Sequence, residues 1–388
     1  YFSLMLANII LLDVYNTMGL PTSTTVALVF CLLGAALAVS TVVITSNDEI
    51  SLVEIGRYIN STRAMAILAG ILLSVILAFT LGTLVMYVSR AIFSFRYHTL
   101  FRRYGALWCG ISFTAIVYFA LFKGLQGVMN GSALFAYIDS HLALSLFVLW
   151  ILCSILLFFL QMFGVNILKL NILAGTFSLA LAFAGNDLVN FIGVPLAGYS
   201  SFIDYTTNGA GASPDSFLMT SLLGPAKTPW YFLIGAGAIM VYALCTSKKA
   251  HAVIKTSVDL SRQDEGEENF GSTPMARTLV RFSMTLANGT SRIMPESTKQ
   301  WINSRFRKNE AIIADGAAFD LVRASVNLVL AGLLIALGTS LKLPLSTTYV
   351  TFMVAMGTSL ADRAWGRDSA VYRITGVLSV IGGWFITA

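Results

Sequence analysis

Six hydroxyl side chains, in two copies of one short motif, are the residues of this sequence best suited to bind an anion. Residues 20–25 are Leu-Pro-Thr-Ser-Thr-Thr, and residues 343–348 are Leu-Pro-Leu-Ser-Thr-Thr. Proline favours the first turn of a helix and Ser or Thr favours its cap, so each copy predicts a helix N-terminus. The free N–H groups and positive dipole end of such a terminus attract anions, and hydroxyls add neutral donors. The candidate anion ligands are Ser23, Thr24, Thr25, Ser346, Thr347 and Thr348.

A second polar group interrupts an apolar stretch and could bind a cation. It consists of Asn186, Asp187 and Asn190. An Asp inside a membrane costs about 2.5–3.5 kcal/mol on insertion scales, so such a residue is a functional candidate by default. Carboxylate and amide oxygens are hard ligands suited to sodium, and the carboxylate could instead carry a proton. The alternative is a polar packing cluster between helices. Gly185 before this group and Gly-Val-Pro at 193–195 after it predict a broken helix.

The composition shows which kind of fold must position these groups. Of the 388 residues, 56% are apolar and only 11% are charged, whereas a soluble chain carries about 25% charged residues. This excludes a soluble domain, a disordered chain and a disulfide scaffold. We expect an all-α polytopic membrane protein, an inverted-repeat secondary transporter with broken helices. Its long uncharged runs predict about ten membrane segments at roughly 20 residues each.

Two basic loops orient these segments. Residues 89–103 contain arginines and no acidic residue, and residues 248–310 hold 11 Lys or Arg against 7 Asp or Glu. Both are expected in the cytoplasm, because positive loops stay on that side. The net charge of +6 is therefore attributed to loops, and no nucleic-acid partner is expected.

The two hydroxyl motifs are 323 residues apart, which indicates a duplicated half rather than a short repeat. One copy alone is typical of an ordinary helix cap, but two copies in apolar surroundings favour a shared site. If each copy begins a crossing segment, the loops place the copies in opposite orientations. Two helix N-termini would then meet near the membrane midplane and could hold a tetrahedral oxyanion. A re-entrant hairpin that does not cross would remove this argument.

The expected division of the chain follows from the repeat. The four parts are the remainder of the first repeat with connecting helices, the start of the second repeat with the acidic group, a partly helical cytoplasmic loop, and the rest of the second repeat. Their bounds are 1–163, 164–247, 248–310 and 311–388.

Three further polar residues precede the second hydroxyl motif. Asp320 and Arg323 are spaced i, i+3 on a predicted helix, which favours a structural ion pair. Asn327 lies one turn further along. We take Arg323 and Asn327 as secondary candidates for the site.

These segments together resemble the inorganic phosphate transporter (PiT) family. That family has two inverted repeats, each with a Gly-Ala-Asn-Asp-Val-Ala-Asn-Ala type motif and a Pro-x-Ser-Thr-Thr motif. The sequence departs from that pattern at Val26 and Tyr349, where the family often has His, and Gly185 directly precedes Asn186 without an intervening Ala. Because the chain opens at Tyr1 without Met and stops at Ala388 inside an apolar run, we expect it to be an internal piece of a longer protein, with the first acidic motif upstream of Tyr1. The resembling segments are residues 21–25, 185–190, 320–327 and 344–348.

The resemblance implies symport of inorganic phosphate, with the Ser and Thr hydroxyls binding phosphate and the Asn and Asp groups binding sodium. Protons remain open as the coupling ion, no organic cofactor is expected, and a homo-oligomer is left open. The lipid environment expected from the compact loops is a bacterial inner membrane. Asp187 favours phosphate over sulfate, because monohydrogen phosphate has a proton to donate and sulfate has none.

Three alternative functions are consistent with part of these observations. A sulfate permease would share the fold, and a passive anion channel would share the anion site. A membrane-embedded phosphotransferase would need clustered His, Asp or Lys at the membrane surface to activate a nucleophile or bind a metal. The sequence shows no such cluster, so we do not expect an enzyme.

Overall fold

The computed structural model describes residues 1–46, 55–56, 59, 61–123, 133–209, 211, 213, 216–218, 220, 224, 228–263, 270–307, 313, 317–341, 343, 345–366 and 369–387. Regular structure in these ranges is helical throughout. Pro344 of the second hydroxyl motif and residues 264–269 and 308–312 lie outside the described residues.

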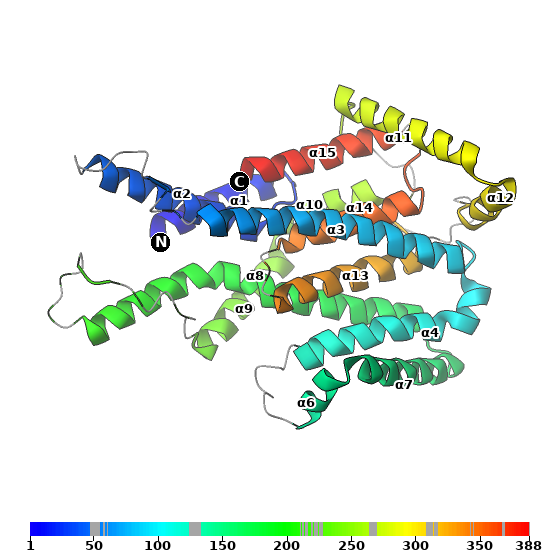
Figure 1. Ribbon diagram of the computed structural model, residues 1–388, viewed down its shortest axis with the longest axis horizontal. Coiled ribbons are helices and arrows are strands. Elements are labelled where there is room, and N and C mark those ends of the chain that lie inside the picture. Colours follow the sequence, from blue (N-terminus) through cyan, green and yellow to red (C-terminus); the bar gives the residue numbers. More distant parts are fainter. Residues whose placement is uncertain are drawn as a thin grey trace.

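Figure 1 shows the described helices, coloured in chain order from blue at the N-terminus to red at the C-terminus. Three of these helices lie within residues 248–310, the segment expected to be a cytoplasmic loop. The bounds are α1 (Phe2–Thr17), α2 (Thr24–Thr45), α3 (Ser61–Phe93), α4 (His98–Val117), the π-helical η2 (Tyr118–Lys123), α6 (Ala133–Ser140), α7 (Leu142–Met162), α8 (Ile167–Asn208), α9 (Trp230–Thr246), α10 (Lys248–Ser261), α11 (Pro274–Ile293), α12 (Glu296–Arg305), α13 (Leu321–Ser340), α14 (Thr347–Ala361) and α15 (Ser369–Thr387).

Six of the described helices are long and apolar enough to cross a membrane, namely α2, most of α3, α7, α8, α13 and α15. The pair α9 and α10, bent by 68°, gives a seventh if it is one span. The chain is therefore an all-α integral membrane protein. The expected ten segments are not confirmed. α1 and α14 have 16 and 15 residues, short of the roughly 20 that a span needs.

The predicted break near the acidic group is wrong, because α8 is one helix of 42 residues that contains Pro195. A proline removes one backbone N–H and crowds the preceding turn, but neighbouring helices in a membrane protein can compensate for this loss. Val194 and Leu196, on either side of Pro195, are both buried. At about 1.5 Å per residue, α8 is about 63 Å long.

The pair α13 and α14 forms a hairpin on the first half of α8. Asn171 Nδ2 of α8 donates to Ser325 Oγ of α13 at 2.5 Å, and Gly332 lies against Ser178 of α8. Both pairs have the same offset in sequence, so α8 and α13 are parallel. The turn after α13 therefore lies beside the middle of α8.

A second hairpin, made of α1 and α2, lies on the other half of α8. Leu4 of α1 and Leu28 of α2 pack against Val194 of α8. Figure 1 shows α1 and α2 toward one end of the molecule, and α13 and α14 toward the other. The turns of the two hairpins approach the middle of α8 from opposite ends.

A cluster of buried charges connects α3 with the start of α13 and the end of α14. Arg90 of α3 is fully buried and donates to Asp320 at 2.8 and 3.1 Å and to Asp362 at 2.9 and 2.6 Å. The predicted Asp320–Arg323 ion pair is wrong. Asp320 is the N-cap of α13, and its Oδ1 accepts the backbone N–H of Arg323 at 3.0 Å, while its charge is paired with Arg90.

Glycine allows α14 to pack closely on α3. A Cβ at Gly357 would lie closer to the Phe79 carbonyl oxygen than real Cβ atoms do, and one at Gly82 would lie 2.8 Å from the Val354 carbonyl oxygen. The equivalent residue after the first hydroxyl motif, Gly34, has open space around it. The two copies therefore differ in packing, although their sequences place a glycine at the same offset from the motif.

Gly357→Ala is expected to lower the free energy of unfolding by about 1–3 kcal/mol, since the α3 backbone must shift to admit the methyl group. The matched variant Gly34→Ala should leave stability unchanged or slightly higher, because alanine is the better helix former at an open site. Denaturant titration of the purified protein in detergent measures both. Equal effects of the two variants would contradict the packing argument.

Candidate functional site

Both hydroxyl motifs begin helices, as predicted. Ser23 is the N-cap of α2 and its Oγ accepts the Val26 N–H at 3.2 Å. Ser346 is the N-cap of α14 and its Oγ accepts the Tyr349 N–H at 3.1 Å. Both serines are buried. A serine that accepts one backbone hydrogen bond can still donate its own hydroxyl hydrogen, so capping leaves both hydroxyls able to bind an anion.

The acidic group contacts the second hydroxyl motif. Thr347 Oγ1 donates to the two carboxylate oxygens of Asp187 at 3.0 and 2.9 Å, and Asn186 Nδ2 donates to Oδ1 at 3.1 Å. Thr347 is buried and Asp187 is half-buried. Residues 160 positions apart are thus brought together at the middle of α8.

The same group also contacts the first hydroxyl motif. Asn190 Nδ2 donates to Thr25 Oγ1 at 2.7 Å, and Asn190 lies on the same side of α8 as Asp187, about one turn further along. The hydroxyl of Thr22, beside this contact in the sequence, is buried without a hydrogen-bond partner among the described residues. The remaining motif hydroxyls, Thr24 and Thr348, are half-buried.

The structure does not bring the two secondary candidates to this point. Asn327 Oδ1 accepts from Thr358 at 2.6 Å, near the end of α14 that lies away from Thr347. Arg323 donates to Gln263 Oε1 at 2.8 Å and also to the Ser261 carbonyl and Ser359 Oγ. We therefore interpret Asn327 and Arg323 as residues that hold α13, α14 and the end of α10 together.

Trp384 is the site residue that the sequence did not indicate. Its Nε1 donates to the Pro21 carbonyl in the first motif at 3.0 Å, and its ring stacks on Tyr349, which follows the second motif, at 3.7 Å between centroids. Tyr15 donates to the neighbouring Gly383 carbonyl at 3.3 Å. A tryptophan near the end of an apolar run is typical of the membrane–water interface, so no pattern indicated a contact with a residue 363 positions away.

Thr347→Val should test whether the contact with Asp187 holds α14 against α8. Valine keeps the shape but cannot donate, and the loss of a hydrogen bond to a carboxylate is expected to cost about 1–2 kcal/mol of unfolding free energy. Thr351→Val is the matched control, because Thr351 Oγ1 bonds only the Thr347 carbonyl of its own helix in the described residues. A loss in Thr351→Val as large as in Thr347→Val would show that the effect is not specific to Asp187.

The arrangement combines donors for an anion with acceptors for a cation. The starts of α2 and α14 supply hydroxyls and helix dipoles, and α8 supplies a carboxylate and amide oxygens between them. Within the described residues, the side chain of Asp187 accepts hydrogen bonds from Thr347 and Asn186, and that of Asn190 donates to Thr25. No protein-family model, curated protein or solved structure matches the chain.

Proposed function

We propose that this protein is a secondary active symporter that carries inorganic phosphate across a membrane together with sodium or protons. The observation that supports this most strongly is the contact of one polar group on α8 with both hydroxyl motifs, through Asn190–Thr25 and Asp187–Thr347. Phosphate would lie between the starts of α2 and α14. The cation would bind at Asn186, Asp187 and Asn190.

Coupling follows from competition for the Thr347 hydroxyl. Without a cation, this hydroxyl donates to Asp187, and the uncompensated carboxylate would repel an incoming phosphate. A cation at Asp187 removes that repulsion and weakens the hydrogen bond that the carboxylate accepts from the Thr347 hydroxyl. Thr347 can then turn to donate to a phosphate oxygen. Anion binding is thereby favoured only when the cation is present.

The two hairpins support an inverted repeat. The turns that lead into α2 and α14 approach the middle of α8 from opposite ends, and each hairpin begins its second helix with the same motif. Rocking one hairpin relative to the other would open the site first to one side of the membrane and then to the other. Both α2 and α14 begin at the proposed site, as expected for discontinuous helices whose N-termini hold an anion.

Sulfate transport and a passive channel remain as rival functions. With sodium bound, an oxygen of Asp187 can still accept the proton of monohydrogen phosphate as a hydrogen bond, whereas sulfate has no proton to donate, so the position of Asp187 beside Thr347 favours phosphate. A channel would carry the anion without a cation gradient.

Uptake of labelled phosphate by liposomes containing the full-length protein tests the proposal. Three conditions are compared: an inward sodium gradient, an inward proton gradient, and neither gradient. Accumulation that requires one gradient and persists in excess sulfate is the expected result, and it identifies the coupling ion. Uptake blocked by sulfate, or uptake that needs no gradient, would exclude the proposed phosphate symport.

A further inference from the structure

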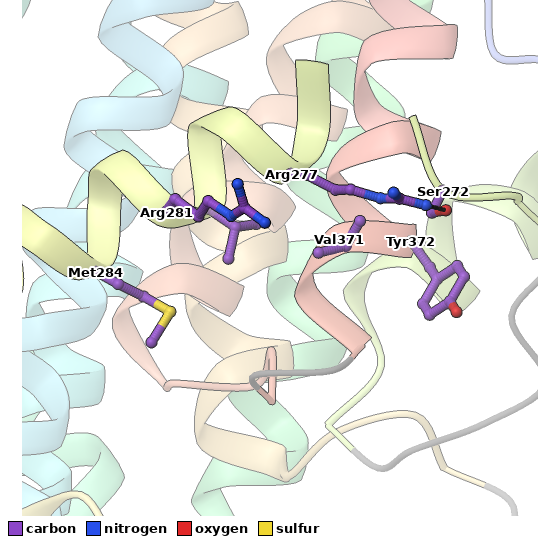
Figure 2. A pocket seen from close by; sticks show the side chains of 7 residues that line it. Ser272, Arg277, Arg281, Met284, Val371 and Tyr372 are labelled. Carbon is purple, nitrogen blue, oxygen red and sulfur yellow. Dashed lines mark hydrogen bonds between the residues drawn. The ribbon is translucent and has the colours of Figure 1, made fainter. Parts of the chain in front are cut away.

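A cavity far from the hydroxyl motifs lies between α11 and the first turn of α15. Its volume is about 480 Å³. Figure 2 shows Arg277 and Arg281 projecting from α11 on the side of Val371 and Tyr372 of α15, with Ser272 beside the Arg277 side chain. None of these residues belongs to the proposed transport site.

The cavity carries positive charge that the described residues do not neutralise. Arg277 and Arg281 are one helical turn apart and both are exposed. Arg277 Nη2 donates to Ser272 Oγ at 2.6 Å, and no Asp or Glu in the described ranges forms an ion pair with either arginine. Two guanidinium groups without a carboxylate partner, on one side of one helix, are a site for an anion.

The rest of the lining narrows the class of anion. Guanidinium groups bind phosphate in a bidentate manner, and the hydroxyls of Ser272 and Tyr372 can add donors. Val280, Met284 and Val371 line the same cavity with apolar surface. A bare inorganic ion would leave that apolar surface unused. A phosphate group attached to an organic or lipid part fits both kinds of lining.

The surroundings place the cavity where such a ligand is found. α11 belongs to the segment expected in the cytoplasm, and it packs against α15, a helix long enough to cross the membrane. Met275, Leu279 and Phe282 of α11 are also exposed, but their spacing places them on the face of the helix opposite the cavity. Basic pockets next to membrane helices on the cytoplasmic side bind phospholipid head groups.

We infer that Arg277 and Arg281, with Ser272 and Tyr372, form a binding site for a phosphate-bearing anion, either the head group of an acidic phospholipid or a soluble phosphate ester. This site is separate from the transport site and does not depend on the proposed symport.

Thermal unfolding of the full-length protein in nanodiscs tests the inference and distinguishes the two sources. One arm compares phosphatidylcholine nanodiscs with and without phosphatidate, and the other adds inositol hexakisphosphate to phosphatidylcholine nanodiscs. A ligand that binds only the folded protein raises the midpoint of unfolding. Each variant is titrated with the same two probes. Arg277→Gln with Arg281→Gln removes the proposed site. Arg102→Gln with Arg103→Gln removes the same charge from the exposed start of α4.

A raised midpoint in either arm, with apparent affinity weakened about tenfold or more by the Arg277/Arg281 pair and left unchanged by the Arg102/Arg103 pair, is the expected result. The arm that responds identifies the source of the phosphate. Equal weakening by both pairs would show diffuse attraction and overturn the site. An unchanged wild-type midpoint in both arms would also overturn it.

Discussion

Replacing Asp187 with Asn should reduce gradient-driven phosphate uptake to the background of empty liposomes. Asparagine keeps the size of the side chain and one oxygen that can accept from Thr347, so the helix contact is largely preserved. The negative charge that binds the coupling cation, or the group that takes the proton, is lost. Without it, cation binding no longer favours phosphate binding, and a gradient cannot drive accumulation.

The control for this variant lies on the same helix. Asp204 accepts from Asn208 at 2.7 Å near the end of α8, so Asp204→Asn removes one charge from α8 away from the hydroxyl motifs and should keep normal uptake. Labelled phosphate uptake and the unfolding midpoint are measured for both variants. If Asp187→Asn folds normally and still accumulates phosphate with the gradient, Asp187 does not couple the two solutes.

The largest expected loss of stability follows from Arg90→Met. Methionine leaves the buried carboxylates of Asp320 and Asp362, whose side chains are 2% and 1% exposed, without the cation that pairs with both. Removing one partner of a buried ion pair costs about 3–5 kcal/mol, because the remaining charge stays unpaired in the interior. Denaturant titration in detergent would show the loss, and a large part of the protein should fail to fold.

A second variant distinguishes the stability lost through unpaired buried charge from the stability lost through poorer packing. In the triple variant Arg90→Met, Asp320→Asn and Asp362→Asn, none of the three paired charges remains, so part of the stability should return. The recovery should be incomplete, because the buried guanidinium of Arg323 also loses the attraction of Asp320 and Asp362. An exposed arginine gives the reference, and Arg103→Met should change the unfolding free energy by less than about 0.5 kcal/mol. The explanation would be wrong if the triple variant were as unstable as Arg90→Met alone.

The parts of the fold that local chemistry determines could be predicted from the sequence. The low charge content indicated a helical membrane protein. The Ser-Thr-Thr motifs indicated helix starts, because the cap is formed within four residues, as at Ser23–Val26 and Ser346–Tyr349. The acidic group was predicted to act together with these motifs, and the structure brings Asp187 and Thr347 into contact.

The parts that depend on distant residues could not be predicted. Glycine and proline suggested a break in α8, but buried neighbours such as Val194 keep the helix continuous through Pro195. The spacing of Asp320 and Arg323 suggested a pair, but Arg90 lies 230 positions away and binds Asp320 instead. No local pattern shows whether a charged residue pairs with a residue of its own helix or with a residue from a distant part of the chain.

The hairpins differ in how firmly they are joined to α8, and this difference determines which contact can move. α13 packs along α8 at Gly175 and Gly332, where a Cβ would already lie 3.0–3.3 Å from atoms of the partner helix. α2 meets α8 over a shorter stretch. We therefore expect helix α8 and the α13–α14 hairpin to move together as one body, and the α1–α2 hairpin to move as a second. A sliding step of one helical turn, about 5.4 Å, would break the Asn190–Thr25 hydrogen bond and leave Asp187–Thr347 intact.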